Sequence, residues 1–311
     1  MSQVNKWHKS GLLYAPGAGA RHPKLVTHAA NPLPVHLEAD IYRVFYSGRD
    51  SENRSSVGSV DIDIVAKRVI AEEFSPGFIH GEPDTFYSHG VSIGNCYFAG
   101  GVQYMLFMGW QRPANAHWRG DIGRLIVDAD HRLSLDGQGI FMGVDSTDPL
   151  SLSYPWVMTD CDGEYPYRMW YGSTMTWDAG NDEMVHVINS AVSLDGHAWE
   201  RRGLALPFTL GQAQAFSRPS VVRNADGSYE MWFSYRSGTG MKYRIGYARS
   251  SNGDDWQLDL NNSGLDVSQS GWDSEMIEYP YVFDHKGTRY MLYNGNGYGA
   301  SGFGLATLER N

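Results

Sequence analysis

The sequence has 311 residues, 42% of them apolar, so the chain is long enough to bury a substantial core. Its 25 lysine and arginine residues stand against 35 aspartate and glutamate residues, and this net charge of −10 argues against a nucleic-acid partner. The sequence contains no apolar stretch of about eighteen residues and no signal-peptide-like start, and its two cysteines are too few for a disulfide framework. We therefore expect a cytoplasmic protein without a membrane span.

One segment pattern recurs five times along the chain. It begins with a tyrosine and continues with alternating apolar and small polar residues, and its copies start at Tyr42, Tyr104, Tyr167, Tyr229 and Tyr290, in steps of 62, 63, 62 and 61 residues. A second segment lies about ten residues before each copy and contains a proline in four repeats, with Ile93 in its place in the second repeat. Two markers in one register indicate repeated units, and the alternation indicates β-strands.

Each repeat has room for three to four short strands. A third alternating segment follows the tyrosine segment, and turn-forming residues that end in a tryptophan, as in 193–199 and 251–256, precede the expected fourth strand. Five such units predict an all-β protein with the fold of a five-bladed β-propeller. We expect a single domain with blades at approximately 25–80, 81–145, 146–208, 209–268 and 269–311.

The two ends of the chain complement each other in this scheme. The fifth repeat stops after its third strand, whereas residues 7–14 resemble the fourth-strand segment that begins at Trp199. We expect residues 7–14 to supply the outer strand of the fifth blade, which closes the ring and removes an open sheet edge.

The first strand of each blade should line a central channel, so residues near the inner-strand prolines and at the ends of the second strands should meet at one mouth. Aromatic faces stack on sugar rings, and amide and guanidinium groups bond sugar hydroxyls. The partner expected at this mouth is therefore a sugar or glycan, and the arginines allow it to be anionic or phosphorylated. The predicted substrate-binding residues are His28, Asn31, Arg49, Arg54, His89, Trp110, Tyr154, Arg218, Asn294 and Asn296.

Three carboxylates are the candidates for catalysis. Glu275 and Glu278 lie in the most acidic stretch expected at the mouth, 270–280, and Asp50 lies in a polar loop after a strand. Burial near the axis raises the pKa of a carboxylate and suits it to act as a general acid or base. The alternatives are that one glutamate caps a turn while the other pairs with an arginine, and that the Asp50 loop is a solvated hairpin.

Two histidines stand at equal positions in neighbouring repeats. His28 and His89 each precede the proline-segment marker by four residues, where they could hold a phosphate, shuttle a proton or help to coordinate a metal. The sequence has no HExxH or CxxC spacing, no GxSxG motif, and no phosphate loop or dinucleotide fingerprint in a suitable context. We therefore predict neither a metal nor a cofactor.

The repeats, with their inner-strand prolines and MWY or MWF second strands, resemble the five-bladed β-propeller glycosidase superfamily, which includes arabinanases, xylosidases, invertases, levansucrases and mannoside phosphorylases. Segments 28–55, 217–250 and 270–306 are similar to glycosidase-like proteins often associated with bacterial surface-polysaccharide gene clusters. The resemblance covers nearly the whole chain. It implies a carbohydrate-active enzyme, a glycoside hydrolase or transglycosidase of surface-polysaccharide metabolism, with its site at the channel mouth.

The carboxylates usual in this superfamily are not in register here. Asn31 takes the place of the general base before the first proline, and Tyr154 takes the place of the carboxylate that tunes the acid. The acid position, two residues before a proline, holds Ser217 in the fourth repeat and Glu278 in the fifth.

These departures leave two alternatives open. The first is a phosphorylase-type enzyme, or one that processes a nucleotide- or phosphate-linked sugar, in which Arg49, Arg54, Arg218 and His89 would hold phosphate. The second is a sugar-binding propeller without catalysis.

Overall fold

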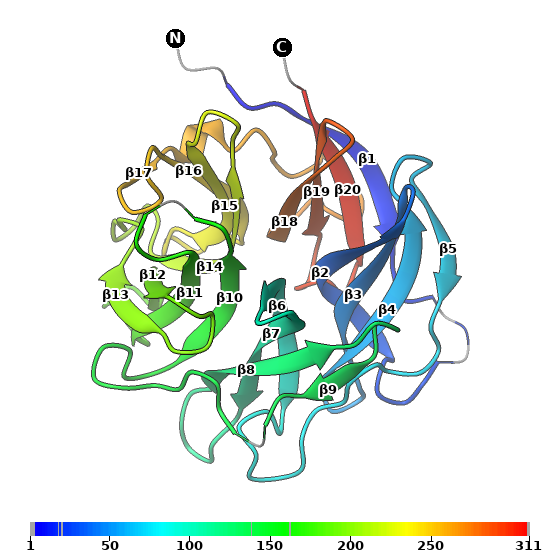
Figure 1. Ribbon diagram of the computed structural model, residues 1–311, viewed down its shortest axis with the longest axis horizontal. Helices are drawn as coiled ribbons and strands as arrows, with labels where there is room; N and C mark the ends of the chain where they lie inside the picture. The colour runs from blue at the N-terminus through cyan, green and yellow to red at the C-terminus, as the bar shows by residue number, and fades with distance from the viewer. Residues whose placement is uncertain (1–3, 18, 20, 138, 162, 310–311) are drawn as a thin grey trace.

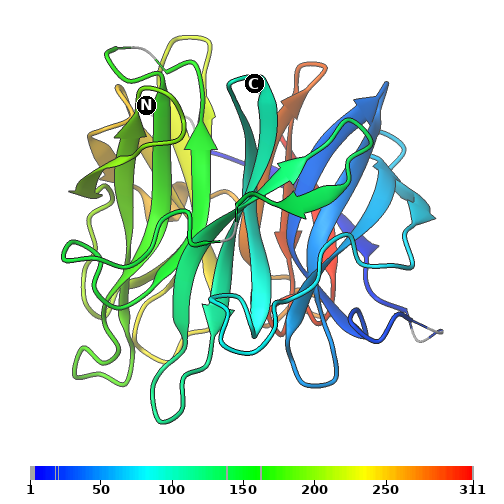
Figure 2. The ribbon, with the colours of Figure 1, turned by 60° about the horizontal axis from the view of Figure 1, so that its bottom comes forward.

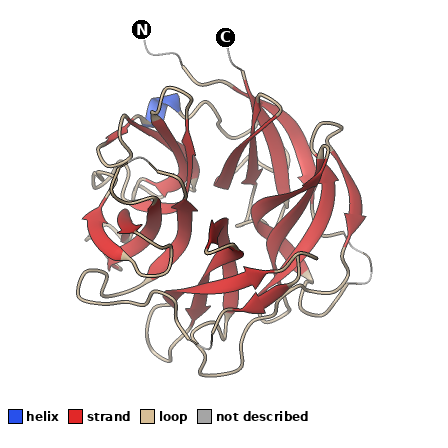
Figure 3. Ribbon diagram, in the orientation of Figure 1, coloured by secondary structure: helices blue, strands red, loops and turns tan. Residues whose placement is uncertain are grey.

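The computed structural model describes residues 4–17, 19, 21–137, 139–161 and 163–309. Within these residues the protein is all-β, apart from one 3-10 turn at Leu260–Asn262, as Figure 3 shows. No helix in the described part of the chain is long and apolar enough to cross a membrane.

The strands form five four-stranded units arranged around a centre (Figure 1), and we call each unit a blade. Blade 1 contains β2 (Thr27–Glu38), β3 (Ile41–Arg49), β4 (Ser55–Asp63) and β5 (Arg68–Glu72). Blade 2 contains β6 (Gly90–Ala99), β7 (Val102–Gln111), β8 (Arg119–Val127) and β9 (Leu133–Leu135). Blade 3 contains β10 (Leu152–Met158), β11 (Tyr167–Thr176), β12 (Val185–Ser193) and β13 (Glu200–Leu204). Blade 4 contains β14 (Ala215–Arg223), β15 (Tyr229–Arg236), β16 (Arg244–Ser250) and β17 (Trp256–Leu258).

Blade 5 combines both ends of the chain. Its strand order is β18 (Glu278–His285), β19 (Thr288–Asn294), β20 (Phe303–Leu308) and β1 (Trp7–Tyr14). The strand β1 pairs antiparallel with β20, from Trp7 opposite Leu308 to Tyr14 opposite Phe303. The prediction that residues 7–14 form the outer strand of the last blade is confirmed.

Within a blade the strands pair antiparallel, whereas the backbone pairing between neighbouring blades that the described residues show is limited to single bridges. A lone parallel bridge between Ser55 and Gly90 joins blades 1 and 2, and a second one between His186 and Ala215 joins blades 3 and 4. In the side view of Figure 2 the strands stand upright and the loops gather at the two rims. Side chains therefore supply most of the packing between blades.

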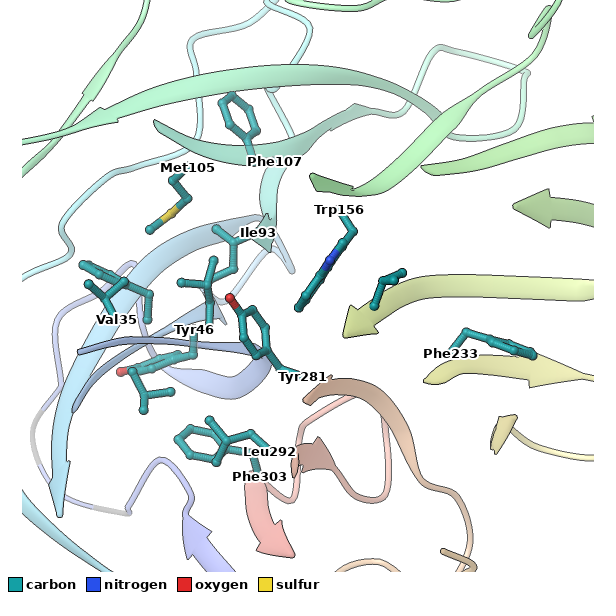
Figure 4. Close-up of a cluster of buried hydrophobic side chains, with 14 of the residues drawn as sticks. Val35, Tyr46, Ile93, Met105, Phe107, Trp156, Phe233, Tyr281, Leu292 and Phe303 are labelled. Carbon is teal, nitrogen blue, oxygen red and sulfur yellow. The ribbon is translucent and has the colours of Figure 1, made fainter. Parts of the chain in front are cut away.

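The apolar core lies between the blades. Figure 4 shows Ile93, Trp156 and Tyr281 approaching one another from three different blades. The rings of Trp156 and Tyr281 are 4.8 Å apart, and Ile93 is fully buried. Aromatic pairs at this distance add stabilisation beyond the area they bury.

Each inner strand is interrupted by an irregular step in its pairing, as in a β-bulge, and the step lies at the same place in blades 1, 3, 4 and 5. In four blades the residue directly before the proline has a positive φ: Asn31 (56°), Tyr154 (36°), Arg218 (48°) and Tyr279 (53°). Positive φ is uncommon for such residues, and a bulge re-aims the side chains beside it. The repeated bulge therefore sets which side chains face the axis.

Blade 2 keeps the predicted register in its strand pairing, since Tyr97 lies opposite Tyr104 as His36 lies opposite Tyr42, but its bulge lies later, between Ile93 and Cys96. Its contacts with the neighbouring blade are shifted by one residue: the backbone N–H of Ile93 donates to Ser47 Oγ, as in blade 5 the N–H of Tyr279 donates to Ser234 Oγ. In these contacts Ile93 takes the place of the residue before the proline, and Gly94 takes the place of the proline. A Cβ on Gly94 would lie 2.2 Å from a backbone carbonyl oxygen of blade 3, so only glycine fits there.

Arg218 joins the inner strands of four blades. Its side chain extends from β14 and is 1% exposed. Nη1 donates to the carbonyl of Tyr279 at 2.8 Å, and Nη2 donates to the carbonyls of Pro32 at 2.8 Å and Gly94 at 3.5 Å. One guanidinium thus satisfies carbonyl groups of blades 5, 1 and 2, which burial would otherwise leave unpaired.

We expect Arg218→Met to lower the free energy of unfolding by at least about 2 kcal/mol, because three buried carbonyl groups lose their donor. Denaturant unfolding followed by tryptophan fluorescence measures the change. The control is Arg132→Met, an exposed residue whose replacement should change stability by about 0.5 kcal/mol or less. Equal stability of the two variants would show that the Arg218 contacts contribute little.

Candidate functional site

A cavity of about 290 Å³ opens at the centre of the molecule and is lined by side chains from all five blades. We call it the central cavity. Its wall includes two tryptophans, Trp110 and Trp118, together with tyrosines, serines and two arginines. A small concave site with aromatic surfaces and a few convergent polar groups is typical of ligand binding.

One ring of equivalent positions surrounds the axis, two residues before the proline position of each blade. Ala30, Ser92, Ser153 and Ser217 occupy it in blades 1 to 4, and all four line the central cavity. Glu278 occupies it in blade 5. Four small side chains leave the space, and the fifth position holds a carboxyl group.

Glu278 is fully buried, and neither of its carboxyl oxygens has a hydrogen-bond partner in the part of the chain that the structure describes. Burial raises the pKa of Glu278 well above its ordinary value, against the opposing charges of Arg236 and Arg49. Desolvation penalises the charged form of a carboxylate, so Glu278 favours its protonated form. A buried carboxyl group that retains its proton is suited to be a general acid.

Tyrosines surround this carboxyl group. The hydroxyl of Tyr154 lies 3.3 Å from that of Tyr279, and their rings are 5.2 Å apart. Tyr243 lies 6.2 Å from Tyr298, and the guanidinium of Arg236 stands 4.8 Å from the ring centre of Tyr243. These rings offer flat apolar surfaces with hydroxyl groups at their edges, which suits contact with a sugar.

Two guanidinium groups line the central cavity. Arg236 donates from Nη2 to Glu183 at 2.7 Å, and its buried Nε has no partner among the described residues. Arg49 makes no hydrogen bond or ion pair with any side chain that the structure describes. Arg49 therefore offers a guanidinium that is free to bind a ligand.

A neutral histidine in the wall links two hydroxyl groups, one of them in the wall and one behind it. His186 Nε2 lies 2.6 Å from Ser153 Oγ, and its Nδ1 lies 2.7 Å from Thr174 Oγ1. Burial, together with the charge of Arg236, lowers the pKa of His186 to about 3. The imidazole is therefore uncharged at neutral pH and fixes the orientation of both hydroxyls.

The structure brings five predicted residues together. Asn31, Arg49, Trp110 and Tyr154 line the central cavity, and Glu278 stands in the ring of positions around it. They come from five strands of four blades, and the rule of inner-strand positions and second-strand ends predicted that they would lie together.

Three predicted binding residues have other surroundings. Asn294 is fully buried: its Oδ1 accepts from the N–H of Asn31, and its Nδ2 donates to the carbonyls of Ala29 and Gly302. Arg218 bonds backbone carbonyls, as described above, and does not line the central cavity. His28 is half-buried outside the cavity wall, and burial and the charge of Arg49 lower its pKa to about 4. Asn294 and Arg218 thus connect blades instead of facing a ligand.

Two predicted catalytic carboxylates lie outside the central cavity. Glu275 is an exposed residue that forms an ion pair with Lys242. Asp50 is 5% exposed, and its oxygens accept from the N–H groups of Glu52 and Arg54 and from Arg54 Nε at 2.9 Å. Although burial opposes ionisation, these hydrogen bonds lower the pKa of Asp50. Asp50 therefore anchors its own turn.

The other predicted residues lie at the rim. Arg54 and His89 border a separate cavity of about 520 Å³ between blades 1 and 2. Asn296 Oδ1 accepts the N–H groups of Glu275 and Met276, so it holds the loop before β18. These three residues do not meet Glu278.

Several residues that line the central cavity were not predicted, and five of them lie at the starts of third strands. Trp118, Met184 and Tyr243 directly precede the third strands of blades 2, 3 and 4, and Ser55 and His186 lie at the starts of β4 and β12. The first residues of a third strand pair with the end of the second strand, as His186 does with Thr174. Extending the rule to the starts of the third strands would have found all five.

Comparison with known proteins gives full-length relatives. No known family profile matches the chain. Two proteins of Mycobacterium tuberculosis, the uncharacterized proteins MT1551 (strain CDC 1551 / Oshkosh) and Rv1502 (strain H37Rv), are each 43% identical over 305 residues, which is 97% of this chain and 99% of theirs.

Solved structures show the fold. A glycoside hydrolase matches with a TM-score of 0.72 at 15% identity, over 99% of this chain and 93% of its own. The endo-arabinase of Bacteroides thetaiotaomicron matches with 0.65 at 14% identity, over 94% and 96%. A protein from the work on mannoside phosphorylases and glycoside hydrolases that target β-1,2 mannosidic linkages in Candida mannan matches with 0.71 at 12%, over 98% and 94%. These neighbours are five-bladed β-propeller glycoside hydrolases and phosphorylase relatives, so the predicted superfamily resemblance is confirmed at the level of fold.

The stability of the protein should depend on pH through Glu278. The raised pKa means that Glu278 keeps its proton to a higher pH in the folded state than in the unfolded chain, where glutamates ionise near pH 4.3. The free energy of unfolding therefore falls as the pH rises above that value, by at most about 1.4 kcal/mol per pH unit. Glu278→Gln, which mimics the protonated acid, should be more stable than wild type at pH 8, and the difference should shrink towards pH 4. Thermal unfolding across pH 4–8 measures it, with the exposed Glu38→Gln as control; a gap that is constant with pH would contradict a raised pKa.

Proposed function

Since this chain belongs to the family of the two mycobacterial proteins and has the fold of five-bladed glycoside hydrolases, we propose that it is a carbohydrate-active enzyme that breaks or transfers a glycosidic bond in the central cavity. The observation that carries the proposal is Glu278, a buried carboxyl group without a hydrogen-bond partner among the described residues, beside aromatic and polar side chains that suit a sugar. Unpaired buried polar groups are costly, and they concentrate at functional sites.

Glu278 acts as the general acid in this proposal. Its proton passes to the glycosidic oxygen as the bond from that oxygen to the anomeric carbon breaks, so the leaving group departs as a neutral alcohol. The carboxylate that remains then accepts the proton of the water or sugar hydroxyl that attacks the anomeric carbon. The charges of Arg236 and Arg49 stabilise the carboxylate during the interval.

The neutral His186, anchored on Thr174, holds the hydroxyl of Ser153 in place for a substrate hydroxyl. Trp110 and Tyr154 provide stacking surfaces on the wall. The site thus offers an acid, apolar faces and fixed polar groups in a single chamber.

Phosphorolysis is a second candidate, which a specific observation favours. The described residues that line the central cavity include two arginines and no carboxylate that could serve as a base opposite Glu278. A phosphate ion needs no base, because it attacks the anomeric carbon as an anion while Glu278 protonates the leaving oxygen; the product is a sugar 1-phosphate.

We also propose that the five blades form a closed ring. Its support is the pairing of β1 with β20 and two hydrogen bonds between the Asn294 side chain and blade 1, in which Asn294 accepts from the N–H of Asn31 and donates to the carbonyl of Ala29. A cytoplasmic location and a role in surface-polysaccharide metabolism stay predictions from the sequence.

Turnover should depend on Glu278. We expect Glu278→Gln to lower kcat by about 10²- to 10⁴-fold, the usual contribution of a general acid, with little change in sugar affinity. The assay measures reducing-sugar release from a panel of oligosaccharides and release of nitrophenol from nitrophenyl glycosides. Glu38→Gln is the control for the loss of a remote charge. If Glu275→Gln loses turnover and Glu278→Gln does not, Glu275 at the rim is the general acid. If the wild-type protein binds sugars but turns none over, it is a binding protein.

Inorganic phosphate separates the two candidate reactions. If the enzyme is a phosphorylase, product formation requires phosphate, and ³¹P NMR detects a sugar 1-phosphate. If it is a hydrolase or transglycosidase, products form in phosphate-free buffer. Each outcome excludes the other reaction as the main one.

A further inference from the structure

The charge of the central cavity is opposite to that of the whole chain. The chain carries a net charge of −10, yet the described residues that line this cavity include Arg49 and Arg236 and no aspartate or glutamate. Glu278 beside them favours its neutral form, as shown above. Glu183, which is not among the lining residues, pairs with Arg236, so the uncompensated positive charge at this cavity is that of Arg49.

Arg49 lacks the partners that other shielded arginines of this protein have. Four of these meet carboxylates: Arg43 with Asp61, Arg124 with Asp136, Arg201 with Asp148 and Arg289 with Asp284. The fully buried Arg218 instead donates to three backbone carbonyl groups. No described carboxylate lies within ion-pair distance of Arg49, although it is half-buried. A cation removed from water without a counter-charge is costly, so the missing partner is expected to come from outside the chain.

Two more donors at the same wall lack partners. Arg236 Nε and Asn31 Nδ2 are buried, and neither meets an acceptor in the described part of the chain. A neutral sugar hydroxyl both donates and accepts, and it leaves a guanidinium charge uncompensated. An oxyanion accepts several donors at once and matches the planar fork of a guanidinium.

The size of the cavity limits where this oxyanion is located. A volume of about 290 Å³ is at the lower end of the range for ligand sites and suits one sugar ring. The sugar ring that lies next to Glu278 and the oxyanion that lies next to Arg49 therefore belong to one small ligand.

We propose that the ligand of the central cavity is a sugar that carries a covalently attached oxyanion, a carboxylate or a phosphate, which Arg49 binds with the help of Arg236. This inference rests on the proposed function for the sugar and on the two arginines for the anion. Once bound, the anion offsets the two charges that lower the pKa of Glu278, so the acid keeps its proton more firmly in the complex.

Calorimetry on the full-length protein at low ionic strength tests the proposal. The probes are D-glucose, D-galactose and D-mannose, the uronic acid and the 6-phosphate of each, and inorganic phosphate. We expect at least one charged sugar to bind at least 10-fold more tightly than its neutral parent. Arg49→Gln should remove that advantage and change the affinity for the neutral parent by less than about 2-fold, whereas Arg49→Lys should retain part of it.

The controls separate loss of the anion site from loss of the fold. Arg132→Gln, an exposed substitution far from the cavity, should keep the advantage of the charged sugar, and thermal unfolding should show Arg49→Gln and Arg49→Lys to be folded. If charged and neutral sugars bind alike, if none binds, or if Arg49→Gln weakens both kinds equally, the proposal is wrong.

Two further outcomes distinguish this inference from the proposed reaction. Tight binding of inorganic phosphate without preference for any charged sugar overturns the inference and supports phosphorolysis. Binding of a charged sugar that depends on Arg49, in a protein that turns over no glycoside, supports the inference and overturns the enzymatic proposal.

Discussion

The side chain of Arg218 joins the carbonyl groups of three other blades at the centre of the molecule, and the arrangement of the inner strands depends on it. Each inner strand is bulged, and a bulge leaves backbone groups outside the regular pairing of its sheet. In the interior those groups need partners. One guanidinium supplies donors to Pro32, Gly94 and Tyr279 together, which a single neutral side chain of similar length cannot do.

The same bulges produce the site. They stand directly after the ring of positions that holds four small residues and Glu278, and the residue at each bulge in four blades has a strained, positive φ. Packing between blades, such as that of Trp156 on Tyr281, offsets this strain. The carboxyl group of Glu278 further lowers the free energy of unfolding, because it is buried without a hydrogen-bond partner among the described residues. Stability is thus reduced where a ligand can be recognised.

Charge in the central cavity follows a simple division. Other carboxylates that lie close to arginines have structural roles. Asp50 holds its own turn, and Glu183 pairs with Arg236. Arg49 keeps no such partner among the described side chains, and Glu278 keeps its proton. A neutral acid beside a free cation can bind an anionic sugar without repelling it and can still deliver a proton.

The sequence by itself determined the repeat, the all-β class and the place of residues 7–14 in the last blade, because alternation and spacing are local properties that recur in every repeat. It also placed Asn31, Arg49, Trp110 and Tyr154 at the central cavity and Glu278 in the ring of positions around it, since their positions follow from the rule of inner-strand positions and second-strand ends. Only the tertiary structure decided which charged groups face the cavity. Four other predicted residues have suitable chemistry but bind elsewhere. Glu275 pairs with Lys242, and Arg218 donates to Gly94, both distant in sequence. Asp50 and Arg54 bond each other within their own loop. Burial and hydrogen bonding are set by packing between blades, so sequence spacing cannot separate a free carboxyl group such as Glu278 from a satisfied one such as Asp50.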